Sequence, residues 1–342
     1  MRKPARLITG AGGEIGHGLV ARLGALGAPI IALDVKPLDT ALLPYVTGSF
    51  TGSITDTSLL ERLLAEFEID QVFHLAALLS TRAEFTPVTA HQVNVEGTLN
   101  LLEFAQRQGE SHGRSVVFVY PSSIAVYGLT NLDDKARAGR VREETHTHPK
   151  TMYGCNKLYC EQLGRYYSSY YKQLSAATMP HVDFRCVRFP GLISAVTLPA
   201  GGTSDYASEM IHAAATGQPY ACFVRPDTRI PFMAMPDAVD ALLTLGHAAR
   251  ESLSQTAYNV SAFNPSAADV RGVALEAFPD AVITYDVDQK RQDIVDSWPA
   301  DVDDSAARHD WGFNPRYDFV RAFGEYLIPT IRERHNRASR AS

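Results

Sequence analysis

The sequence predicts an α/β fold in which helices cover both faces of a parallel sheet, with a smaller lobe in the second half. Three observations favour this fold. Short apolar runs alternate with segments of helical period through the first half, a glycine-rich turn joins the first run to the first helix, and the alternation stops after Pro190. Apolar runs of this kind are typical of strands that are buried on both faces of a doubly wound, Rossmann-type sheet.

The first half of the chain divides into strands and helices as follows. The apolar runs predict strands at 5–10, 29–34, 71–77, 115–123 and 182–194. Segments with helical period lie between them and predict helices at 15–26, 57–66, 93–108 and 151–173.

Beyond Pro190 the pattern changes to Gly-rich, Pro-rich and acidic stretches, which predict loops and short elements of a second lobe. We therefore assign residues 1–190 to a dinucleotide-binding domain, to which 231–262 return. Residues 191–230 and 263–330 form the second lobe. Residues 331–342 are a charged tail that we expect to fray.

Charge and composition narrow the possible partners. The 342 residues include 32 basic and 38 acidic side chains, a net charge of −6, which offers no general attraction for nucleic acid or anionic lipid. We expect no membrane span, because no apolar run approaches the roughly 18 residues that a span needs. We also expect no secretion signal, because the glycine turn begins within the first ten residues.

The cysteines favour a reducing compartment. Cys155, Cys160, Cys186 and Cys222 have neither a CxxC nor a Cys/His metal spacing, and four cysteines in a chain this long do not form a disulfide framework. We expect free thiols, no metal site and a cytoplasmic location.

The glycine turn "TGAGGEIG" is the first motif that indicates chemistry. Gly10, Gly13 and Gly16 lie between the first predicted strand and helix, where backbone N–H groups and a helix N-terminus can meet a pyrophosphate. An ordinary tight turn would give the same pattern, but Asp34 ends the second predicted strand, where a carboxylate can accept hydrogen bonds from an adenosine ribose. This favours NAD over NADP, although Lys36 keeps NADP open.

A tyrosine and a lysine in "KTMYGCNK" are the second motif. Tyr153 and Lys157 are four residues apart, so on a helix they share one face. A cation about 5 Å from the phenol, at an effective dielectric near 20, would lower its pKa by roughly two units, and an oxidised nicotinamide would add to this. Such pairs also occur by chance on amphipathic helices, but Ser122 and Ser123 end a predicted strand at the sheet edge where ligands bind.

Together these residues resemble the extended short-chain dehydrogenases/reductases, and within them the short-chain type of L-threonine 3-dehydrogenases. The resemblance covers nearly the whole chain and rests on "HLAALLS", "PSSIAVYG", "TMYGCNK", "RFPGLIS", "PAGGTSDYA", "MAMPDAVDA" and "RQDIVDSWPADVDDSAARHDWGFNP". It implies NAD-dependent oxidation of L-threonine at C3 to 2-amino-3-oxobutanoate, or the same reaction on a close β-hydroxy-α-amino acid. It also implies a homodimer formed by a four-helix interface.

The resemblance also implies roles for individual residues. Tyr153 would be the general base, Lys157 would tune it and bind the ribose, and Ser123, rather than Ser122, would orient the substrate oxygen. Substrate contacts would come from Ser80, Ser123, Tyr153, Arg188, Thr203, Ser204 and Trp298, with Arg188 and Pro190 also toward the cofactor. Cofactor contacts would come from Gly10, Gly13, Glu14, Ile15, Gly16, Asp34, Ile54, Leu75, Ala76, Ala77, Asn94, Tyr153, Lys157 and Pro190.

Three departures from the family pattern bear on specificity. Ala200 and Ser204 stand where "PGGGTTDYA" has a third glycine and a second threonine, and the smaller Ser204 would admit longer substrates. Ser53 replaces a common acidic adenine contact, which would reduce cofactor affinity. Two insertions, "RQGESHGRS" and "KQLSAATMPH", lengthen loops away from the motifs.

Two other functions use the same motifs. An NAD-retaining 4-epimerase or dehydratase of nucleotide sugars would need the same serine, tyrosine and lysine together with a UDP pocket. A non-catalytic NAD(P)-sensing protein would need only the glycine turn, and such proteins usually lose the reactive tyrosine, which this chain keeps. The sequence leaves side-chain preference, rate and lobe closure open.

Overall fold

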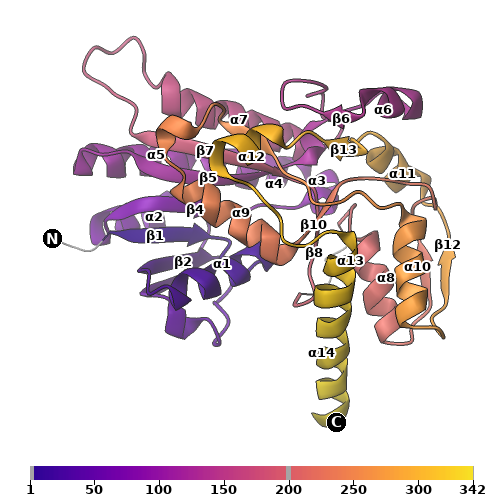
Figure 1. Ribbon diagram of the computed structural model, residues 1–342. Helices are drawn as coiled ribbons and strands as arrows, with labels where there is room; N and C mark the ends of the chain where they lie inside the picture. Colours follow the sequence, from indigo (N-terminus) through magenta and orange to yellow (C-terminus); the bar gives the residue numbers. More distant parts are fainter. Residues whose placement is uncertain (1–3, 198–201, 342) are drawn as a thin grey trace.

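The computed structural model describes residues 4–197 and 202–341, with 335–341 described through the backbone alone. Seven strands of the described residues form one central sheet in which all neighbours pair in parallel (Figure 1). Its order is β3-β2-β1-β4-β5-β7-β11. The strands are β1 (Ala5–Thr9), β2 (Ile30–Asp34), β3 (Gly48–Thr51), β4 (Ile69–His74), β5 (Val116–Ser123), β7 (Val182–Phe189) and β11 (Ala257–Asn259).

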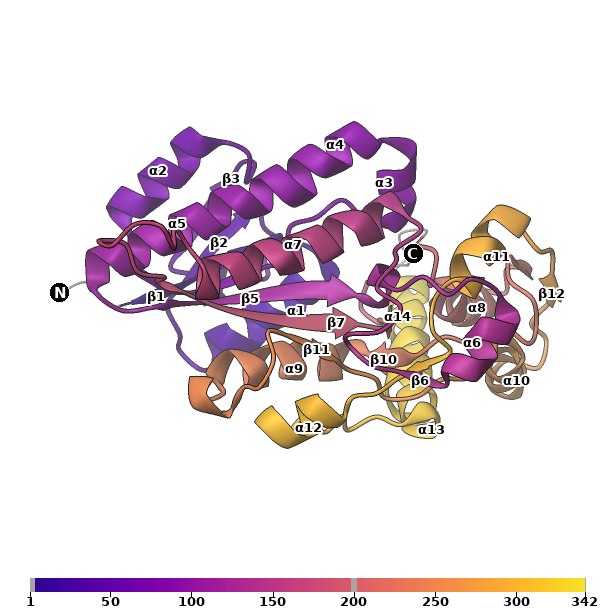
Figure 2. The same cartoon turned by 90° about the horizontal axis from the view of Figure 1, so that it is seen from above.

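Helices cover both faces of this sheet, as Figure 2 shows. One face carries α2 (Thr57–Glu66), α5 (Gly97–His112) and α7 (Met152–Ser169), and the other carries α1 (Glu14–Ala25) and α9 (Met235–His247). The apolar side chains on each face form a separate core, which is why most residues of the central strands are buried. The predicted Rossmann-type fold is confirmed.

Two elements of the sheet were not predicted from the sequence. The edge strand β3 reads GSFT and its residues are partly or largely exposed, so it has no apolar run to reveal it. The strand β11 is three residues long and forms the other edge of the sheet, where it pairs with β7.

Helix boundaries also differ from the sequence-based expectation. Instead of one helix at 93–108, the chain forms α3 (Ser80–Phe85), α4 (Pro87–His91), a π-helical stretch (Gln92–Glu96) and then α5. The helix predicted to reach residue 173 ends at Ser169.

The second lobe lies beside the carboxyl ends of the central strands (Figure 1). Three short parallel pairs of strands lie outside the central sheet: β8 (Gly191–Ile193) with β10 (Phe232–Ala234), β9 (Tyr220–Cys222) with β12 (Ile283–Tyr285), and β6 (Arg140–Val141) with β13 (Asp301–Val302). The helices beside them are α6 (Leu132–Ala138), α8 (Tyr206–Ala215), α10 (Ala267–Ala277), α11 (Gln289–Asp296) and α13 (Phe319–Arg321), while α12 (Ser305–Trp311) packs on β11 of the central sheet. Single 3-10 turns lie at Leu43–Tyr45, Ile124–Val126 and Arg250–Ser252.

The C-terminal segment corrects the expectation of a frayed tail. A π-helical stretch (Ala322–Leu327) continues into α14 (Ile328–Ala341), so the chain is helical to Ala341. Buried Leu327, Ile328 and Ile331 hold the start of this helix against the second lobe. No helix in the described part of the chain is long and apolar enough to span a membrane.

Candidate active site

The glycine turn brings three elements into close contact. Gly10 has a φ of +69°, and a Cβ there would lie 2.7 Å from the backbone nitrogen of Ala76. A Cβ on Gly16 would lie 2.3 Å from the carbonyl oxygen of Gly10. Neither position tolerates a side chain, so these glycines let the start of α1 and the loop after β4 approach the end of β1.

Asp34 lies at the end of β2 beside this turn. Its Oδ2 accepts a hydrogen bond from the backbone nitrogen of Gly12 at 3.0 Å, and Oδ1 accepts one from the backbone nitrogen of Lys36 at 3.1 Å. Both bonds orient the carboxylate along the edge of the cavity described next, which Asp34 itself lines. This is the position in which an acid receives ribose hydroxyls and repels a 2′-phosphate.

A cavity of about 570 Å³ runs along the carboxyl edge of the sheet and under the second lobe. Most of the predicted site residues line it, from the glycine turn at one end to the tyrosine at the other. They are Gly10, Gly13, Glu14, Ile15, Gly16, Asp34, Ile54, Leu75, Ala76, Ala77, Ser80, Ser123, Tyr153, Lys157, Pro190, Ser204 and Trp298.

The features of this cavity fit a dinucleotide. The N-terminus of α1 has backbone N–H groups without partners inside the helix, and the adjoining glycines leave room for a pyrophosphate. Asp34 and Ser53 line the end where an adenosine would lie, and Tyr153 and Lys157 line the end where a nicotinamide would lie. Ser53 forms a hydrogen bond with Thr55 at 2.7 Å and offers no negative charge there.

The helix α7 holds Tyr153 and Lys157 against the serine loop, which is the segment from Ser123 to Leu129. Thr151 caps the helix, since its Oγ1 accepts a hydrogen bond from the backbone nitrogen of Gly154 at 3.0 Å. A Cβ on Gly154 would lie 2.1 Å from the carbonyl oxygen of Ala125, so this glycine lets the helix pack directly on the loop after Ser123. Ser123 in turn accepts a hydrogen bond from the backbone nitrogen of Ala125 at 3.2 Å.

Lys157 is buried beneath the site. Its Nζ donates to the carbonyl oxygen of Pro121 at 2.6 Å and lies 4.4 Å from the ring centre of Tyr120 and 5.5 Å from that of Tyr153. Burial lowers the pKa of Lys157 to about 8, although the acidic groups of Cys160, Cys186 and Glu161 act in the opposite direction.

The pKa of Tyr153 corrects the sequence-based expectation. The pair was expected to bring the phenol into working range, but burial raises the pKa of Tyr153 well above the usual value for a tyrosine. The reason is that the protein alone penalises both charged forms, the phenolate and the ammonium, by removing them from water. An oxidised nicotinamide bound beside Tyr153 would add a positive charge that favours the phenolate.

Three predicted residues lie outside the cavity lining. Asn94 is buried behind it, where its Oδ1 accepts a hydrogen bond from the backbone nitrogen of Leu78 at 2.7 Å and its Nδ2 donates to the carbonyl oxygen of Leu78 at 3.1 Å. Asn94 thus fixes the loop after β4. Thr203 is also buried, with its Oγ1 3.5 Å from Oγ of Ser80. Ala200 lies outside the described residues.

Arg188 is the third predicted residue outside the cavity lining, after Asn94 and Thr203, and its expected contact with the substrate is corrected. Its guanidinium is buried and bonds Glu161, Tyr127 and the carbonyl oxygen of Glu143. The reason is its place on β7, where the side chain points under α7 rather than into the cavity.

Several cavity residues were missed by sequence reasoning. Arg82 of α3 lines the cavity with an exposed side chain, two residues after Ser80. Asp205 lines it from the turn that holds Ser204. Burial raises the pKa of Glu14, and the charge of Asp205 adds to this shift. Ser122, which the sequence analysis placed at the sheet edge but ranked below Ser123, also lines the cavity, and its buried hydroxyl has no hydrogen-bond partner within the described residues. Arg82 and Asp205 sit beside predicted site residues, and that adjacency was the available signal.

Comparison with known proteins agrees with this geometry. Residues 6–261 match the family described as the NAD dependent epimerase/dehydratase family. The chain belongs to this family. It is 35% identical over 340 residues to the mitochondrial L-threonine 3-dehydrogenase of Bos taurus, covering 98% of this chain and 84% of that protein. It is 37% identical over 318 residues to an uncharacterized epimerase/dehydratase of Staphylococcus aureus, 92% of each chain.

Solved structures of this family include similar chains. A holo-form L-threonine dehydrogenase from Cupriavidus necator superimposes with a TM-score of 0.85 at 34% identity, covering 96% of this chain and all of that one. The predicted resemblance to extended short-chain dehydrogenases/reductases is thus confirmed.

Proposed function

We propose that this protein uses NAD to oxidise L-threonine at C3 to 2-amino-3-oxobutanoate, or a close β-hydroxy-α-amino acid to the corresponding 3-oxo product. The observation that carries the proposal is that Tyr153, Lys157 and Ser123 line the same cavity as the glycine turn and Asp34. The sequence likeness to L-threonine 3-dehydrogenases, which extends over 98% of the chain, supports the choice of substrate.

Each residue has a part in this reaction. The Ser123 hydroxyl orients the substrate oxygen, and Tyr153 removes the hydroxyl proton as the C3–O bond gains double-bond character. Lys157 supplies positive charge beside the phenolate and reaches the ribose. A nicotinamide held between the glycine turn and Tyr153 would supply the hydride acceptor for C3. Holding the substrate in a dry cavity contributes much of the rate, because the reacting groups no longer have to be brought together.

The cavity lining suits a zwitterionic amino acid. Hydroxyl groups of Ser80 and Ser204 and the guanidinium of Arg82 offer donors for the carboxylate, while Asp205 offers an acceptor for the ammonium group. We assign these contacts as part of the proposal. Ser204, smaller than a threonine at this place, leaves room for a longer β-substituent.

Asp34 sets the expected cofactor preference, which a substitution tests. Replacing Asp34 by serine removes the negative charge that a 2′-phosphate would meet, so we expect the ratio of NADP to NAD affinity to rise about tenfold or more. Binding titrations with both dinucleotides measure this without any assumption about substrate. The matched control is Asp133→Ser, an exposed acid on α6. An unchanged ratio in Asp34→Ser would contradict the assignment of the adenosine end.

A homodimer is also part of the proposal. Apolar side chains of the α5 and α7 side of the molecule are exposed, among them Leu99 at 37%, Tyr159 at 52% and Tyr166 at 40%. A second copy packed on these helices would cover them. Light scattering of the purified protein distinguishes a dimer from a monomer.

A substrate panel tests the proposed reaction directly. With NAD and L-threonine, L-allo-threonine, D-threonine, L-serine, phenylserine or UDP-glucose, we expect NADH absorbance with L-threonine or another β-hydroxy amino acid and none with UDP-glucose. The family description also includes epimerases and dehydratases, so nucleotide-sugar chemistry is the second candidate. Cofactor that stays bound through purification, together with thermal stabilisation by UDP-sugars, would favour it. No turnover with any substrate would favour a cofactor sensor.

A further inference from the structure

A buried ion pair lies directly beneath the catalytic helix. Glu161 is one turn beyond Lys157 on α7, and Arg188 faces it from β7. Arg188 Nε donates to Glu161 Oε1 at 2.9 Å, and Nη2 donates to Oε2 at 2.6 Å. The two side chains are only 5% and 3% exposed, so the pair is bidentate and dry.

The same guanidinium also holds the serine loop. Arg188 Nη1 donates to the Tyr127 hydroxyl at 2.8 Å and to the carbonyl oxygen of Glu143 at 2.7 Å. Tyr127 follows the 3-10 turn that Ser123 caps. One side chain therefore bonds both the helix that carries Tyr153 and the loop that carries Ser123.

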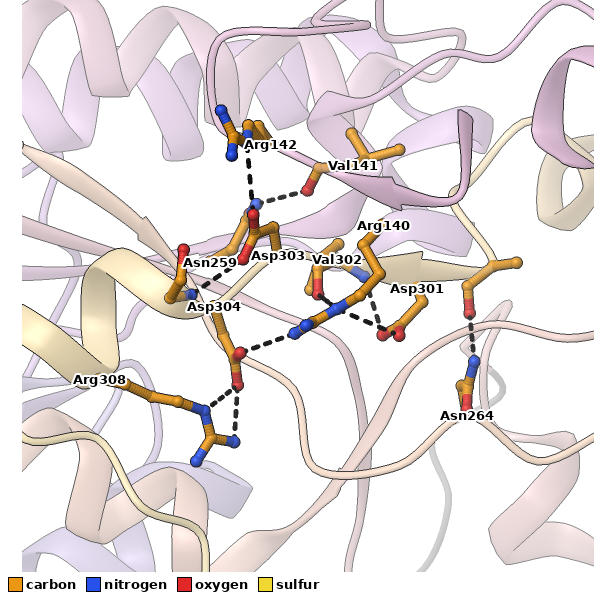
Figure 3. A network of polar contacts seen from close by, with 12 residues as sticks. Arg140, Val141, Arg142, Asn259, Asn264, Asp301, Val302, Asp303, Asp304 and Arg308 are labelled. Atoms are coloured by element: carbon orange, nitrogen blue, oxygen red, sulfur yellow. Dashed lines mark hydrogen bonds and ion pairs between the residues drawn. The ribbon is translucent and has the colours of Figure 1, made fainter. Parts of the chain in front are cut away.

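The hydrogen bonds continue into the second lobe. The Tyr127 hydroxyl donates to Asn259 Oδ1 at 2.7 Å, and Asn259 Nδ2 donates to the carbonyl oxygen of Val141 at 3.0 Å. That carbonyl also accepts from the backbone nitrogen of Asp303 at 2.9 Å, where β6 meets β13 (Figure 3). Trp298, which lines the cavity, precedes β13 by a few residues.

Ion pairs also hold β6 and β13 together, where this series of hydrogen bonds ends. Arg140 Nη2 donates to Asp304 at 2.8 Å, and Arg308 Nε donates to the same carboxylate at 3.0 Å (Figure 3). Arg142 pairs with Asp303 at 3.3 Å. The strand after Trp298 is thus fixed to the segment that follows the serine loop.

We propose that Arg188 is a positioning residue, which sets α7 with Tyr153 and Lys157 in register with Ser123 and with the segment that carries Trp298. The proposal rests on the proposed function for the roles of those four residues. Stability alone gives no reason for the ion pair, because an apolar pair of similar volume is often as stable as a buried salt bridge. The ion pair instead fixes the orientation of the Arg188 guanidinium. Four of the five N–H donors of Arg188 form hydrogen bonds, and these bonds reach three separate segments of the chain.

The charge of Glu161 also acts on Lys157. The titratable or charged groups around Lys157 are Tyr153, Cys160 and Glu161 of α7, Tyr120 of β5, Cys186 of β7 and His74 of β4. Burial lowers the pKa of Lys157, while Cys160, Cys186 and then Glu161 favour the protonated lysine. Removing the charge of Glu161 should therefore lower the pKa of Lys157 further, a change that a purely structural ion pair would not produce in the pH profile.

Three variants separate positioning from stability. Arg188→Lys keeps the charge but loses the fork, so we expect kcat for L-threonine to fall about tenfold to a hundredfold while KM stays within about threefold. Glu161→Gln should shift the alkaline limb of the pH profile to lower pH. The double variant with Glu161→Met and Arg188→Met should regain the melting temperature and still show the low kcat.

The matched control lies on the same strand. Arg185 is equally buried on β7 and bonds Asp183 and the carbonyl oxygens of Leu245 and Ala248, away from the cavity. Arg185→Lys should lower the melting temperature as Arg188→Lys does but leave kcat within about twofold. Equal loss of kcat in both variants, or wild-type kcat in the double methionine variant, would overturn the proposal.

A second measurement does not depend on the substrate. Hydrogen exchange followed by mass spectrometry should show at least about tenfold faster exchange in α7 and in residues 124–129 for Arg188→Lys and not for Arg185→Lys. Unchanged exchange there overturns the proposal. If the wild-type protein oxidises nothing in the substrate panel, the proposed function fails, and this measurement still decides whether Arg188 holds the two segments.

Discussion

Replacing Tyr153 by phenylalanine is expected to reduce threonine-dependent NADH production by about a thousandfold or more, because a positioned general base contributes roughly 10²- to 10⁴-fold to such a proton transfer. The ring remains, so the packing of α7 and the cavity walls should change little. NAD affinity, measured by fluorescence titration, should stay within a few-fold of the wild type, since the glycine turn and Asp34 are untouched.

The control is Tyr159→Phe on the same helix. Tyr159 is 52% exposed and does not line the cavity, so its hydroxyl should be dispensable. Initial rates at saturating NAD and a melting curve are needed for both variants. If Tyr153→Phe keeps more than about a tenth of the activity while folded, another group removes the proton.

The pH dependence of the wild-type rate follows from the two shifted groups. The reactive form needs a deprotonated Tyr153, whose pKa burial raises, and a protonated Lys157, whose pKa burial lowers to about 8. In the protein alone, the pH at which Tyr153 loses its proton is higher than the pH at which Lys157 does. The state with a phenolate and an ammonium therefore has a small population. Bound oxidised nicotinamide adds a positive charge that favours the phenolate, so the ternary complex should work at a lower pH than Tyr153 alone would allow.

Local patterns predicted much of the fold. The buried strand β5 begins with a continuous apolar run, β7 has apolar residues between its charged ones, and α2 was predicted with the bounds that the structure has. The edge strand β3 was missed because half-exposed residues carry no such signal. The helix expected at 93–108 begins inside the π-helical stretch Gln92–Glu96 and ends before α5 does, because α5 runs from Gly97 to His112.

The candidate site was predictable where backbone geometry restricts the residue type. Gly10 and Gly16 are positions where no side chain fits, and the spacing of Tyr153 and Lys157 fixes their common face. The role of Arg188 was not predictable, because an arginine beside a cofactor motif looks the same in sequence whether it points into the cavity or under a helix. Its partners Glu161 and Tyr127 are 27 and 61 residues away along the chain.

Replacing Lys157 by methionine is expected to abolish activity and, at neutral pH, to stabilise the ligand-free protein. A folded pKa of about 8 against 10.5 for an ordinary lysine means that burying the ammonium costs on the order of 3 kcal/mol at pH 7. Methionine removes this cost and keeps the volume, but the carbonyl oxygen of Pro121 loses its donor, at about 1–2 kcal/mol. A net gain of about 1–2 kcal/mol should raise the melting temperature by a few degrees.

The sign of the pH dependence distinguishes this cause from better packing. Because the folded pKa of Lys157 is depressed, the unfolded chain binds more protons between about pH 8 and 10.5, so this group's penalty is complete below pH 8 and disappears as the pH rises. At pH 10 the penalty falls to about 1 kcal/mol, and the advantage of Lys157→Met should vanish or reverse. The exposed Lys290→Met on α11 is the control and should follow the wild type at every pH.

A loss of stability in Lys157→Met at pH 7, or a gain that persists unchanged at pH 10, would show that burying the Lys157 ammonium does not destabilise the fold. The expected result would instead identify Lys157 as a residue that lowers the stability of the fold. A buried ammonium beneath a tyrosine is retained against that cost only if its charge is used, and the nearest group that can use it is the Tyr153 phenol, 5.5 Å from Nζ to the ring centre. Lost activity together with gained stability would thus locate the reactive centre at this pair, whichever β-hydroxy acid proves to be the substrate.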